Sequence, residues 1–428
     1  MLPSLSDNRA LRLFAFTALY VAQGLPYGMF MIAIPTWLSF TGASVATVAN
    51  FTAIVALPWS FKLIVAPFMD WLRFPAMGSR RPWVILAQIG IVLPWLYLAF
   101  NPETKDIALL TALGFLLNLF GATQDVAVDG MAIEILPENE RALANSLMFA
   151  GQVAGISFSS AVGAALLKNY GLSSAGWMMG FCTFAILLVP LLLREHPGER
   201  LLPWSPGAAR PSESVRHTQL GEFGQQLLHA LLLPTSILIL LGQFLDRVGN
   251  GIFIGIMPSL STHALHWSQT VYPNWASGAG IASAVLGVVL APMIARAGTD
   301  RAFGMAVLAK LMCLAAIAFS APYWAVTGFM PVAIIMVNAI GQIASVAVVA
   351  LCMSACSPRI AATQFAIYMA TANIATAAGG TLVALLSQWG IGFSGMFLVA
   401  AALTGSVLLF WRHVDIETHR TRLEPLVN

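Results

Sequence analysis

The chain has 428 residues, of which 58% are hydrophobic and 9% charged, and its mean hydropathy is +0.81. Soluble domains carry roughly a quarter of charged residues, so this composition excludes an ordinary soluble protein. The net charge of +3 is dispersed among short polar segments, and we therefore expect no nucleic-acid partner.

Apolar runs of about 20 residues recur along the whole chain, and each is long enough for a helix that crosses a bilayer. Their apolar character is continuous, which favours helices over the alternating strands of a membrane barrel. The sequence predicts an all-α membrane protein with twelve transmembrane helices, at about 13–40, 45–68, 83–100, 107–131, 142–166, 176–193, 234–262, 272–295, 302–320, 327–355, 361–386 and 392–411.

Lys and Arg are distributed unevenly between the two sides of these spans. Most of the 21 fall on one side if the N-terminus is cytoplasmic, so the positive-inside rule predicts that both termini are cytoplasmic. All four cysteines lie in predicted spans. Cys352 and Cys356 are one turn apart but no His or carboxylate accompanies them, so neither a metal site nor a cofactor is expected.

The polar segment 194–233 is rich in Pro, Gly, Ser and Arg, and is predicted to be a cytoplasmic linker whose later part forms an amphipathic surface helix. It separates an N-terminal six-helix bundle (1–193) from a C-terminal one with a short tail (234–428). The bundles are repeats, because Asn118 and Gly121 of the fourth span recur as Asn338 and Gly341 of the tenth. Two pseudo-symmetric halves of six parallel-repeated helices define the major facilitator architecture.

Two aspartates, Asp125 and Asp129, lie one helical turn apart inside the fourth span. A carboxylate in hydrocarbon costs several kcal/mol, so intramembrane acids indicate function by default. The same repeat offset aligns them with Ser345 and Val349, so acids are not needed to build this helix. We predict proton coupling by Asp125 and Asp129, with Lys62 of the second span as their partner. The alternative is a static salt bridge, and for Asp129 a latch at the cytoplasmic end.

Polar stripes mark several of the spans, and the resemblance to the facilitator fold implies that these spans face a central cavity. We predict that substrate contacts come from Tyr20, Gln23, Tyr27, Trp59, Gln152, Gln243, Asp246, Arg247, Asn250, Gln364 and Tyr368. For any one of these residues the alternative is an interhelical hydrogen bond. Adjacent helical residues point apart, so pairing of Asp246 with Arg247 stays open. Lys310 has no evident partner, and snorkelling or packing would explain it equally well.

The loop Asp70-WLRFPAMGSRRPW resembles the cytoplasmic signature of the facilitator superfamily, although Ser79 interrupts its Gly-Arg-Arg cluster. We assign a gating role to Asp70, Arg73, Arg80 and Arg81. The pair Gly151 and Gly155 is predicted to permit close helix packing.

Four segments, Tyr20-VAQGLPYG, Phe61-KLIVAPFMD, Thr123-QDVAVDG and Ala362-TQFAIYMA, resemble the AmpG-related branch of the major facilitator superfamily. That branch includes muropeptide permeases, acetyl-coenzyme A transporters and siderophore importers of the pyochelin and rhizobactin type. The resemblance implies a non-enzymatic transporter of a bacterial inner membrane, and carries the family's intramembrane acids onto Asp125 and Asp129 and its lysine onto Lys62.

The predicted function is import of an amphipathic solute by proton-coupled alternating access, with a ferric siderophore as the first expectation. The aromatic and amide-rich lining suits such a complex, and the muropeptide permeases carry extra C-terminal spans whereas this chain ends after twelve. An anhydromuropeptide permease is the alternative substrate class, and a non-transporting receptor on the same scaffold is the alternative from another class. An intramembrane aspartyl protease is disfavoured because both acids share one helix. Expected partners are the solute, protons and the lipid bilayer, and the expected state is a monomer.

Overall fold

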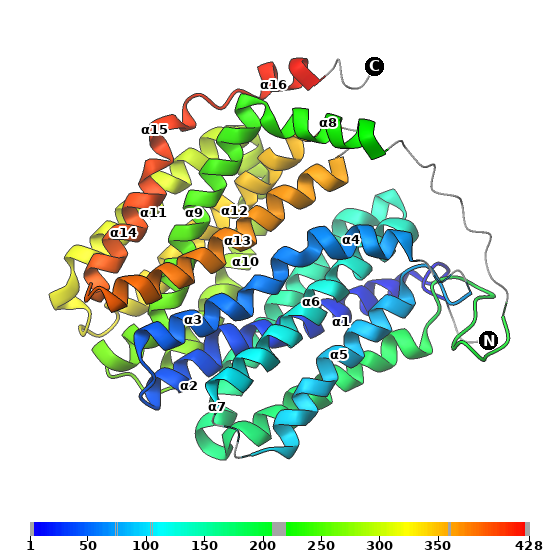
Figure 1. Cartoon of the computed structure of the whole chain (residues 1–428), viewed down its shortest axis with the longest axis horizontal. Coiled ribbons are helices and arrows are strands. Elements are labelled where there is room, and N and C mark those ends of the chain that lie inside the picture. Colours follow the sequence, from blue (N-terminus) through cyan, green and yellow to red (C-terminus); the bar gives the residue numbers. More distant parts are fainter. Residues whose placement is uncertain are drawn as a thin grey trace. The chain divides into compact units, whose positions relative to one another are not determined.

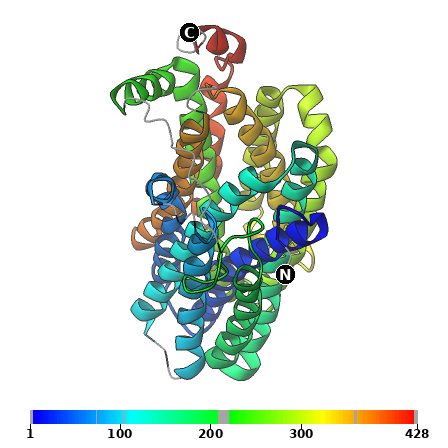
Figure 2. The same cartoon turned by 90° about the vertical axis from the view of Figure 1, so that its right-hand side faces the viewer.

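The computed structural model describes residues 4–72, 74, 76–102, 104, 106–207, 220–357 and 361–423. Within these ranges every regular element is a helix, and β pairing is limited to an isolated bridge between Ser4 and Arg194. The all-α prediction is confirmed. Figure 1 traces the helices in chain order from α1 to α16, and Figure 2 shows them after a quarter turn.

The first half of the chain follows the predicted spans. Span one runs through α1 (Arg9–Gly28), the π-helical turn η1 (Met29–Ala33) and α2 (Ile34–Phe40). Span two runs through α3 (Val45–Ala56), the 3₁₀ turn η2 (Leu57–Phe61) and α4 (Lys62–Trp71). The following spans are contained in α5 (Arg81–Phe100), α6 (Ile107–Ile135) and α7 (Glu138–Leu192).

The helix α7 contains two spans. Its apolar part, Leu143–Leu192, would be about 75 Å long if straight, more than twice the roughly 30 Å of a hydrocarbon core. Gly171 interrupts it with φ 79° and ψ −176°, a conformation that glycine adopts without the strain a side chain would bring. The described residues hold 11 helices long and apolar enough to cross a membrane, and the break at Gly171 divides one of them. The prediction of twelve spans is therefore confirmed.

The second half begins with the amphipathic helix α8 (Leu220–Leu232) that was expected in the linker. The spans then follow as α9 (Pro234–Ser259) with η3 (Leu260–Ala264), α10 (Val271–Ala297), α11 (Thr299–Phe319), α12 (Phe329–Ser354), α13 (Ala361–Gln388), and α14 (Phe393–Ser406) with α15 (Leu408–Trp411). A 3₁₀ turn, η4 (Ala321–Tyr323), precedes α12. The final helix α16 (Ile416–Leu423) packs Leu423 against Ala230 and Leu233, and Figures 1 and 2 both show it beside α8.

Contacts divide the chain into two compact units. Unit 1 comprises Met1–Leu38, Ile54–Ser214 and Ser268–Ser277, and unit 2 comprises Ser39–Ala53, Val215–Trp267 and Gly278–Asn428. The units follow the expected halves along most of the chain, but residues 39–53 and 268–277 are exchanged between them. The expected linker is also shared, because its first part belongs to unit 1 and α8 to unit 2.

Glycines bring helix backbones into contact inside each unit. A Cβ atom on Gly155 of α7 would lie 2.2 Å from the carbonyl oxygen of Val21 in α1, and one on Gly151 would lie 2.6 Å from that of Thr17. In unit 2, a Cβ on Gly379 of α13 would lie 2.3 Å from the carbonyl oxygen of Val248 in α9. Close packing at Gly151 and Gly155 is therefore confirmed, and the first and fifth spans of each half pack in the same way.

The two halves also repeat a local hydrogen bond. Asn118 in α6 donates from Nδ2 to the carbonyl oxygen of Gly114 over 2.9 Å, and Asn338 in α12 donates to that of Ile334 over 2.8 Å. The two donors, Asn118 and Asn338, are 220 residues apart, and so are the two acceptors, Gly114 and Ile334. This is the offset at which the fourth and tenth spans repeat in the sequence. The helices α6 and α12 can therefore be compared residue by residue.

Candidate functional site: charges inside the spans

Lys62 and Asp125 form an ion pair within unit 1, between their Nζ and Oδ2 atoms. Lys62 begins α4, directly after the 3₁₀ turn in which Pro58 lacks an amide hydrogen, and Asp125 lies on α6. The Asp125 side chain is 8% exposed and that of Lys62 is 25% exposed. The pair is thus enclosed on the carboxylate side and open on the ammonium side.

Trp59 supports the lysine from the same turn. The Lys62 Nζ lies 4.8 Å from the centre of the Trp59 ring, within the range of a cation–π interaction. The indole Nε1 donates to Asn118 Oδ1 over 2.8 Å, so the repeated asparagine of α6 fixes the ring. Trp59 was predicted to contact substrate; the structure places it beside Lys62, and the substrate role stays a prediction.

Asp129 has a different partner from Asp125, although the two are one turn apart on α6. Its Oδ1 accepts a hydrogen bond from the Tyr20 hydroxyl of α1. Within the described part of the chain Asp129 forms no ion pair, and its side chain is exposed where that of Asp125 is buried. The site therefore joins spans one, two and four, with one carboxylate paired to a cation and the other to a hydroxyl.

A second intramembrane ion pair lies in unit 2 and corrects the expectation for Lys310. Its Nζ is 2.9 Å from Asp246 Oδ1 and 3.4 Å from the carbonyl oxygen of the same residue. The side chains are 1% and 5% exposed, so water is excluded from both partners. Asp246 therefore pairs with Lys310 of α11 and not with its neighbour Arg247. The sequence did not show this pairing, because the rotation of α11 against α9 decides which of their side chains meet.

Arg247 points to another partner. Its Nη2 donates to Ser345 Oγ of α12 over 2.8 Å, and its Nε is buried without a hydrogen-bond partner among the described residues. Ser345 is the residue that the repeat aligns with Asp125.

Three residues predicted to contact substrate instead form a hydrogen-bonded network inside unit 2. Gln243 Nε2 donates to the Tyr368 carbonyl over 2.9 Å, Gln364 Nε2 lies 3.3 Å from the Tyr368 hydroxyl, and that hydroxyl donates to Ser236 Oγ over 3.0 Å. All are buried. Interhelical hydrogen bonding, the alternative considered for such residues, accounts for Gln243, Gln364 and Tyr368 in this conformation.

The remaining predicted contacts divide by exposure. Gln23 is fully buried, and neither polar atom of its amide has a partner in the described chain. Tyr27, Gln152 and Asn250 are partly exposed on the first, fifth and seventh spans. A substrate role for these four residues stays a prediction.

At the predicted cytoplasmic end of unit 1, two of the assigned gating residues, Arg80 and Arg81, contact a glutamate that the sequence reading did not single out. The carboxylate of Glu195 accepts from the backbone N–H groups of Ser79, Arg80 and Arg81, and so caps α5. Burial raises the pKa of Glu195 to about 7, against the lowering effect of the Arg81 and Arg80 amides.

The two arginines connect this cap to neighbouring segments. Arg80 Nε lies 3.3 Å from Glu134 Oε1, and the guanidinium of Arg81 donates to the carbonyl oxygens of Pro190, Leu191, Arg200 and Leu201. Arg73 lies outside the described residues, as does the side chain of Asp70. The first part of the expected linker is therefore bound to unit 1 through Arg81.

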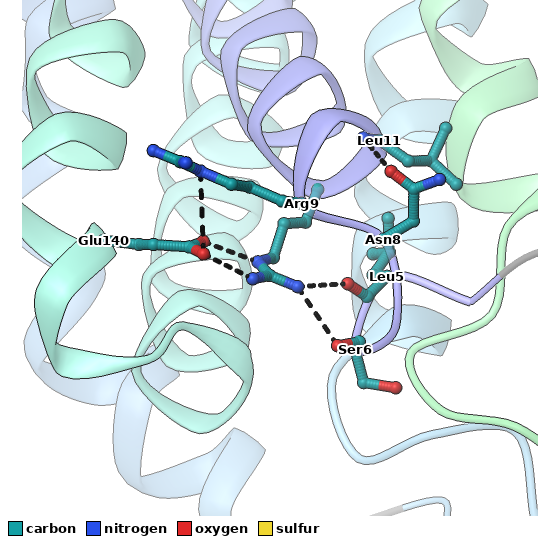
Figure 3. Close-up of polar contacts among 7 residues, drawn as sticks. Leu5, Ser6, Asn8, Arg9, Leu11 and Glu140 are labelled. Atoms are coloured by element: carbon teal, nitrogen blue, oxygen red, sulfur yellow. Dashed lines mark hydrogen bonds and ion pairs between the residues drawn. The ribbon is translucent and has the colours of Figure 1, made fainter.

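A further ion pair joins the start of span one to the start of span five. Arg12 donates from Nε and Nη2 to the two oxygens of Glu140, over 2.8 and 2.7 Å, and Arg9 Nε lies 3.7 Å from the same carboxylate (Figure 3). Arg12 also donates to the carbonyl oxygen of Ser6 over 3.1 Å. In the sequence these three residues look like ordinary charged residues near the span ends. Only the tertiary structure shows that they form ion pairs between the first and fifth spans.

The described residues include no cluster of three His, Cys, Asp or Glu side chains that could hold a metal ion, and the four cysteines are free thiols.

Twelve spans in two repeated halves, with ion pairs inside the spans, are the architecture of a polytopic membrane protein. The chain matches the family model of the Major Facilitator Superfamily over residues 16–238 and 239–425, and it belongs to that superfamily. It is a multi-pass transporter and not an enzyme.

Two relatives connect the chain with the AmpG-related branch, as the sequence motifs predicted. The anhydromuropeptide permease of Escherichia coli (strain K12) is 23% identical over 401 residues, which are 91% of this chain and 77% of that protein. A Rickettsia conorii protein named for AmpG-type transport is 26% identical over 183 residues, which are 42% of this chain and 43% of that protein.

A solved structure shows the same fold at low identity. The D-xylose-proton symporter gives a TM-score of 0.70 with 13% identity, covering 94% of this chain and 97% of that chain. The twelve-helix facilitator fold is thereby confirmed.

Proposed function

We propose that this protein imports an amphipathic solute across a bacterial inner membrane by alternating access, driven by protons that bind Asp125 and Asp129. The observation that carries the proposal is the ion pair between Lys62 and Asp125 inside the spans. Such a pair is costly in hydrocarbon, and the Lys62 side chain is 25% exposed whereas that of Asp125 is 8% exposed, so the carboxylate is the more enclosed partner.

The chemistry follows from charge balance. A proton added to a carboxylate oxygen of Asp125 removes the negative charge and frees the Lys62 ammonium to face solvent or solute. Deprotonation on the other side restores the pair. Asp129, one turn away and hydrogen-bonded to Tyr20, forms no ion pair among the described residues of unit 1 and can take a proton without breaking one. Two such acids on one helix couple protonation to the arrangement of spans one, two and four.

For the substrate, an anhydromuropeptide is the first class to test. Support comes from the permease of that solute, which is 23% identical over 91% of this chain. A ferric siderophore was the first expectation from the sequence, but it is now the second class to test, because the name of neither relative described above refers to a siderophore. Both are amphipathic, and the indole of Trp59 beside the charged pair suits a solute with an apolar face.

The test is uptake into proteoliposomes that hold the purified protein, with an inwardly directed proton gradient and radiolabelled anhydromuropeptide or ferric siderophore. Asp125→Asn is expected to abolish accumulation above the external concentration. Asp106→Asn is the matched control. It is the same Asp-to-Asn substitution on the same helix, but Asp106 is the exposed N-cap and lies away from the site. The control should accumulate solute as the unmodified protein does.

Proton-dependent accumulation by the Asp125→Asn protein would exclude Asp125 as a coupling residue. Binding of solute without any flux in the unmodified protein would favour the receptor alternative.

A further inference from the structure

Away from the span ends, the described spans contain three acidic residues, Asp125, Asp129 and Asp246, and three basic residues, Lys62, Arg247 and Lys310. Two of the acids form ion pairs with two of the bases. Lys62 pairs with Asp125, and Lys310 pairs with Asp246. Asp129 is left in unit 1 and Arg247 in unit 2. Asp129 becomes neutral when it takes a proton. A guanidinium does not lose its proton in a protein, so Arg247 needs an anion from elsewhere.

The surroundings of Arg247 do not supply that anion. Among the described residues of unit 2, no carboxylate lies within ion-pair distance of it, and its one hydrogen-bond acceptor there is the neutral hydroxyl of Ser345, at 2.8 Å. Its Nε is buried without a partner. An uncompensated charge and an orphaned donor are both costly in an apolar interior, so the protein keeps them at an expense that stability does not explain.

The internal repeat shows what is missing. Asp125 and Ser345 occupy the same place in the repeat, offset by 220 residues. In unit 1 the carboxylate at that place neutralises Lys62, whereas in unit 2 the hydroxyl at that place only orients Arg247. Arg247 lies on span seven and Lys62 on span two, so the two cations are not repeat counterparts; the difference between the units is that the aligned position contacts its cation with a carboxylate in unit 1 and with a hydroxyl in unit 2.

We propose that Arg247 binds a carboxylate of the transported solute, and that the solute is therefore an anion; this inference rests on the proposed function. A single guanidinium matches one carboxylate through two parallel N–H···O bonds. A phosphate ester carries more charge and would call for further cations, but the other two mid-span cations are already paired. Ser345 is the positioning residue, since it holds one edge of the guanidinium and leaves the other donors for the solute.

The experiment compares two forms of one probe, an anhydromuropeptide with free peptide carboxylates and its carboxamide derivative, in the proteoliposome assay. The unmodified protein should take up the acid with a half-saturating concentration at least about tenfold lower than that of the amide, which corresponds to about 1.4 kcal/mol. Arg247→Gln should abolish the preference, and Arg247→Lys should retain part of it. If the protein accumulates a ferric siderophore and no anhydromuropeptide, the same comparison is made with the acid and carboxamide forms of the siderophore.

Ser345→Asp is the second variant and needs no loss of the arginine. It supplies the counter-ion that the repeat has in unit 1, so the new carboxylate should neutralise Arg247 and remove the preference for the acid. Arg412→Gln, at an exposed arginine beyond the spans, is the matched control and should leave the preference unchanged. Monodispersity in detergent identifies any variant that fails to fold.

The outcomes separate the two proposals. Equal uptake of acid and amide by the unmodified protein overturns the anion site and leaves the transporter proposal standing. If Arg247→Gln reduces the uptake of the acid and of the amide equally, Arg247 has a structural role in helix packing and does not bind the solute carboxylate. Uptake of no solute by the unmodified protein overturns the proposed function, and this inference with it.

Discussion

The two intramembrane ion pairs contain the same chemical groups in different surroundings. Lys310 and Asp246 are 1% and 5% exposed, and the lysine also contacts the aspartate carbonyl. Lys62 is 25% exposed and lies over Trp59, with a second acid one turn beyond its partner. The enclosed pair has almost no access to water, whereas the Lys62 side chain of the other pair is partly open. The comparison teaches that a charge inside a span does not by itself indicate coupling, and the proposed coupling role belongs to the pair with the more exposed partner.

The repeat extends this comparison to the positions of the enclosed pair. Span seven follows span one at an offset of 223, as Gly28 and Gly251 show, and this offset aligns Asp246 with Gln23; Lys310 of span nine lies 222 residues after Gln88 of span three. Both glutamines are fully buried, and their amide atoms have no hydrogen-bond partners within the described chain. Unit 1 thus has neutral amides at the positions where unit 2 has its ion pair. The charged residues Lys62, Asp125 and Asp129 of unit 1 lie on other helices, α4 and α6.

The largest effect is expected from Asp246→Asn. This change leaves the Lys310 ammonium buried without an anion, and breaking a buried pair from one side costs about 3–5 kcal/mol. Thermal unfolding of the detergent-purified protein measures the loss. Asp246→Asn combined with Lys310→Met should recover most of it. A single variant as stable as the unmodified protein would contradict the structural role.

Glu195→Gln tests a third environment, a buried carboxylate capped by backbone amides and lying outside the spans. Burial raises its pKa from 4.5 to about 7, so the folded protein binds this proton more tightly than the unfolded chain. The stabilisation that Glu195 contributes by binding this proton is therefore fully present below pH 4.5. It is lost as the pH rises through about 7, which lowers the free energy of unfolding by up to about 3 kcal/mol. Glutamine does not titrate, so the variant should show a flatter melting temperature between pH 5 and 8.

The control for that series is Glu417→Gln, at an exposed position on α16. It should keep the pH slope of the unmodified protein. A Glu195→Gln protein with the same slope as both would show that another group titrates.

Asp125→Asn should destabilise the protein less than Asp246→Asn does. Lys62 is partly exposed and rests on the Trp59 ring, so its ammonium can turn to solvent when the carboxylate is removed. The expected loss is about 1–3 kcal/mol, measured in the same thermal assay, although transport is lost. Equal destabilisation by the two substitutions would abolish the distinction between the pairs.

The smallest effect is expected from Tyr20→Phe, which removes one hydroxyl donor to Asp129. We expect a loss of about 0.5–1.5 kcal/mol in stability and a reduction of a few fold in the uptake rate, because the carboxylate is less well oriented. Tyr97→Phe makes the same change on an exposed face of α5 and should alter neither quantity. Unchanged uptake in Tyr20→Phe would remove Tyr20 from the site.

Some site contacts could be predicted because they follow from spacing along one helix or from the repeat. Asp125 lies in a span whose counterpart carries Ser345, and Lys62 is the one lysine in the neighbouring second span, so their pairing was foreseeable. The close contact at Gly151 and Gly155 follows likewise from a four-residue spacing. Asp246 shows the limit of this reasoning, since its partner is set by the rotation of α11 against α9, and periodicity does not report that rotation.

The same limit applies to polar residues that share a stripe. Gln243 and Tyr368 were predicted to line a cavity because each follows the polar face of its helix. In the structure those faces meet each other, and the amide donates to the tyrosine carbonyl. Glu195 and Glu140 were overlooked for the converse reason: their partners are a loop backbone and the start of a distant helix, which no local pattern identifies.

The sequence by itself determined that this protein is an all-helical membrane protein of twelve spans in two repeated halves, because bilayer thickness and backbone hydrogen bonding leave few other ways to arrange such long apolar runs. It also identified the acids that need an explanation. Only the tertiary structure decided which charge meets which: Lys310 with Asp246, Tyr20 with Asp129, and Arg247 with a hydroxyl in place of a carboxylate. Those choices depend on how whole helices pack against one another, and a few tens of degrees of rotation change the partner of every side chain on the face.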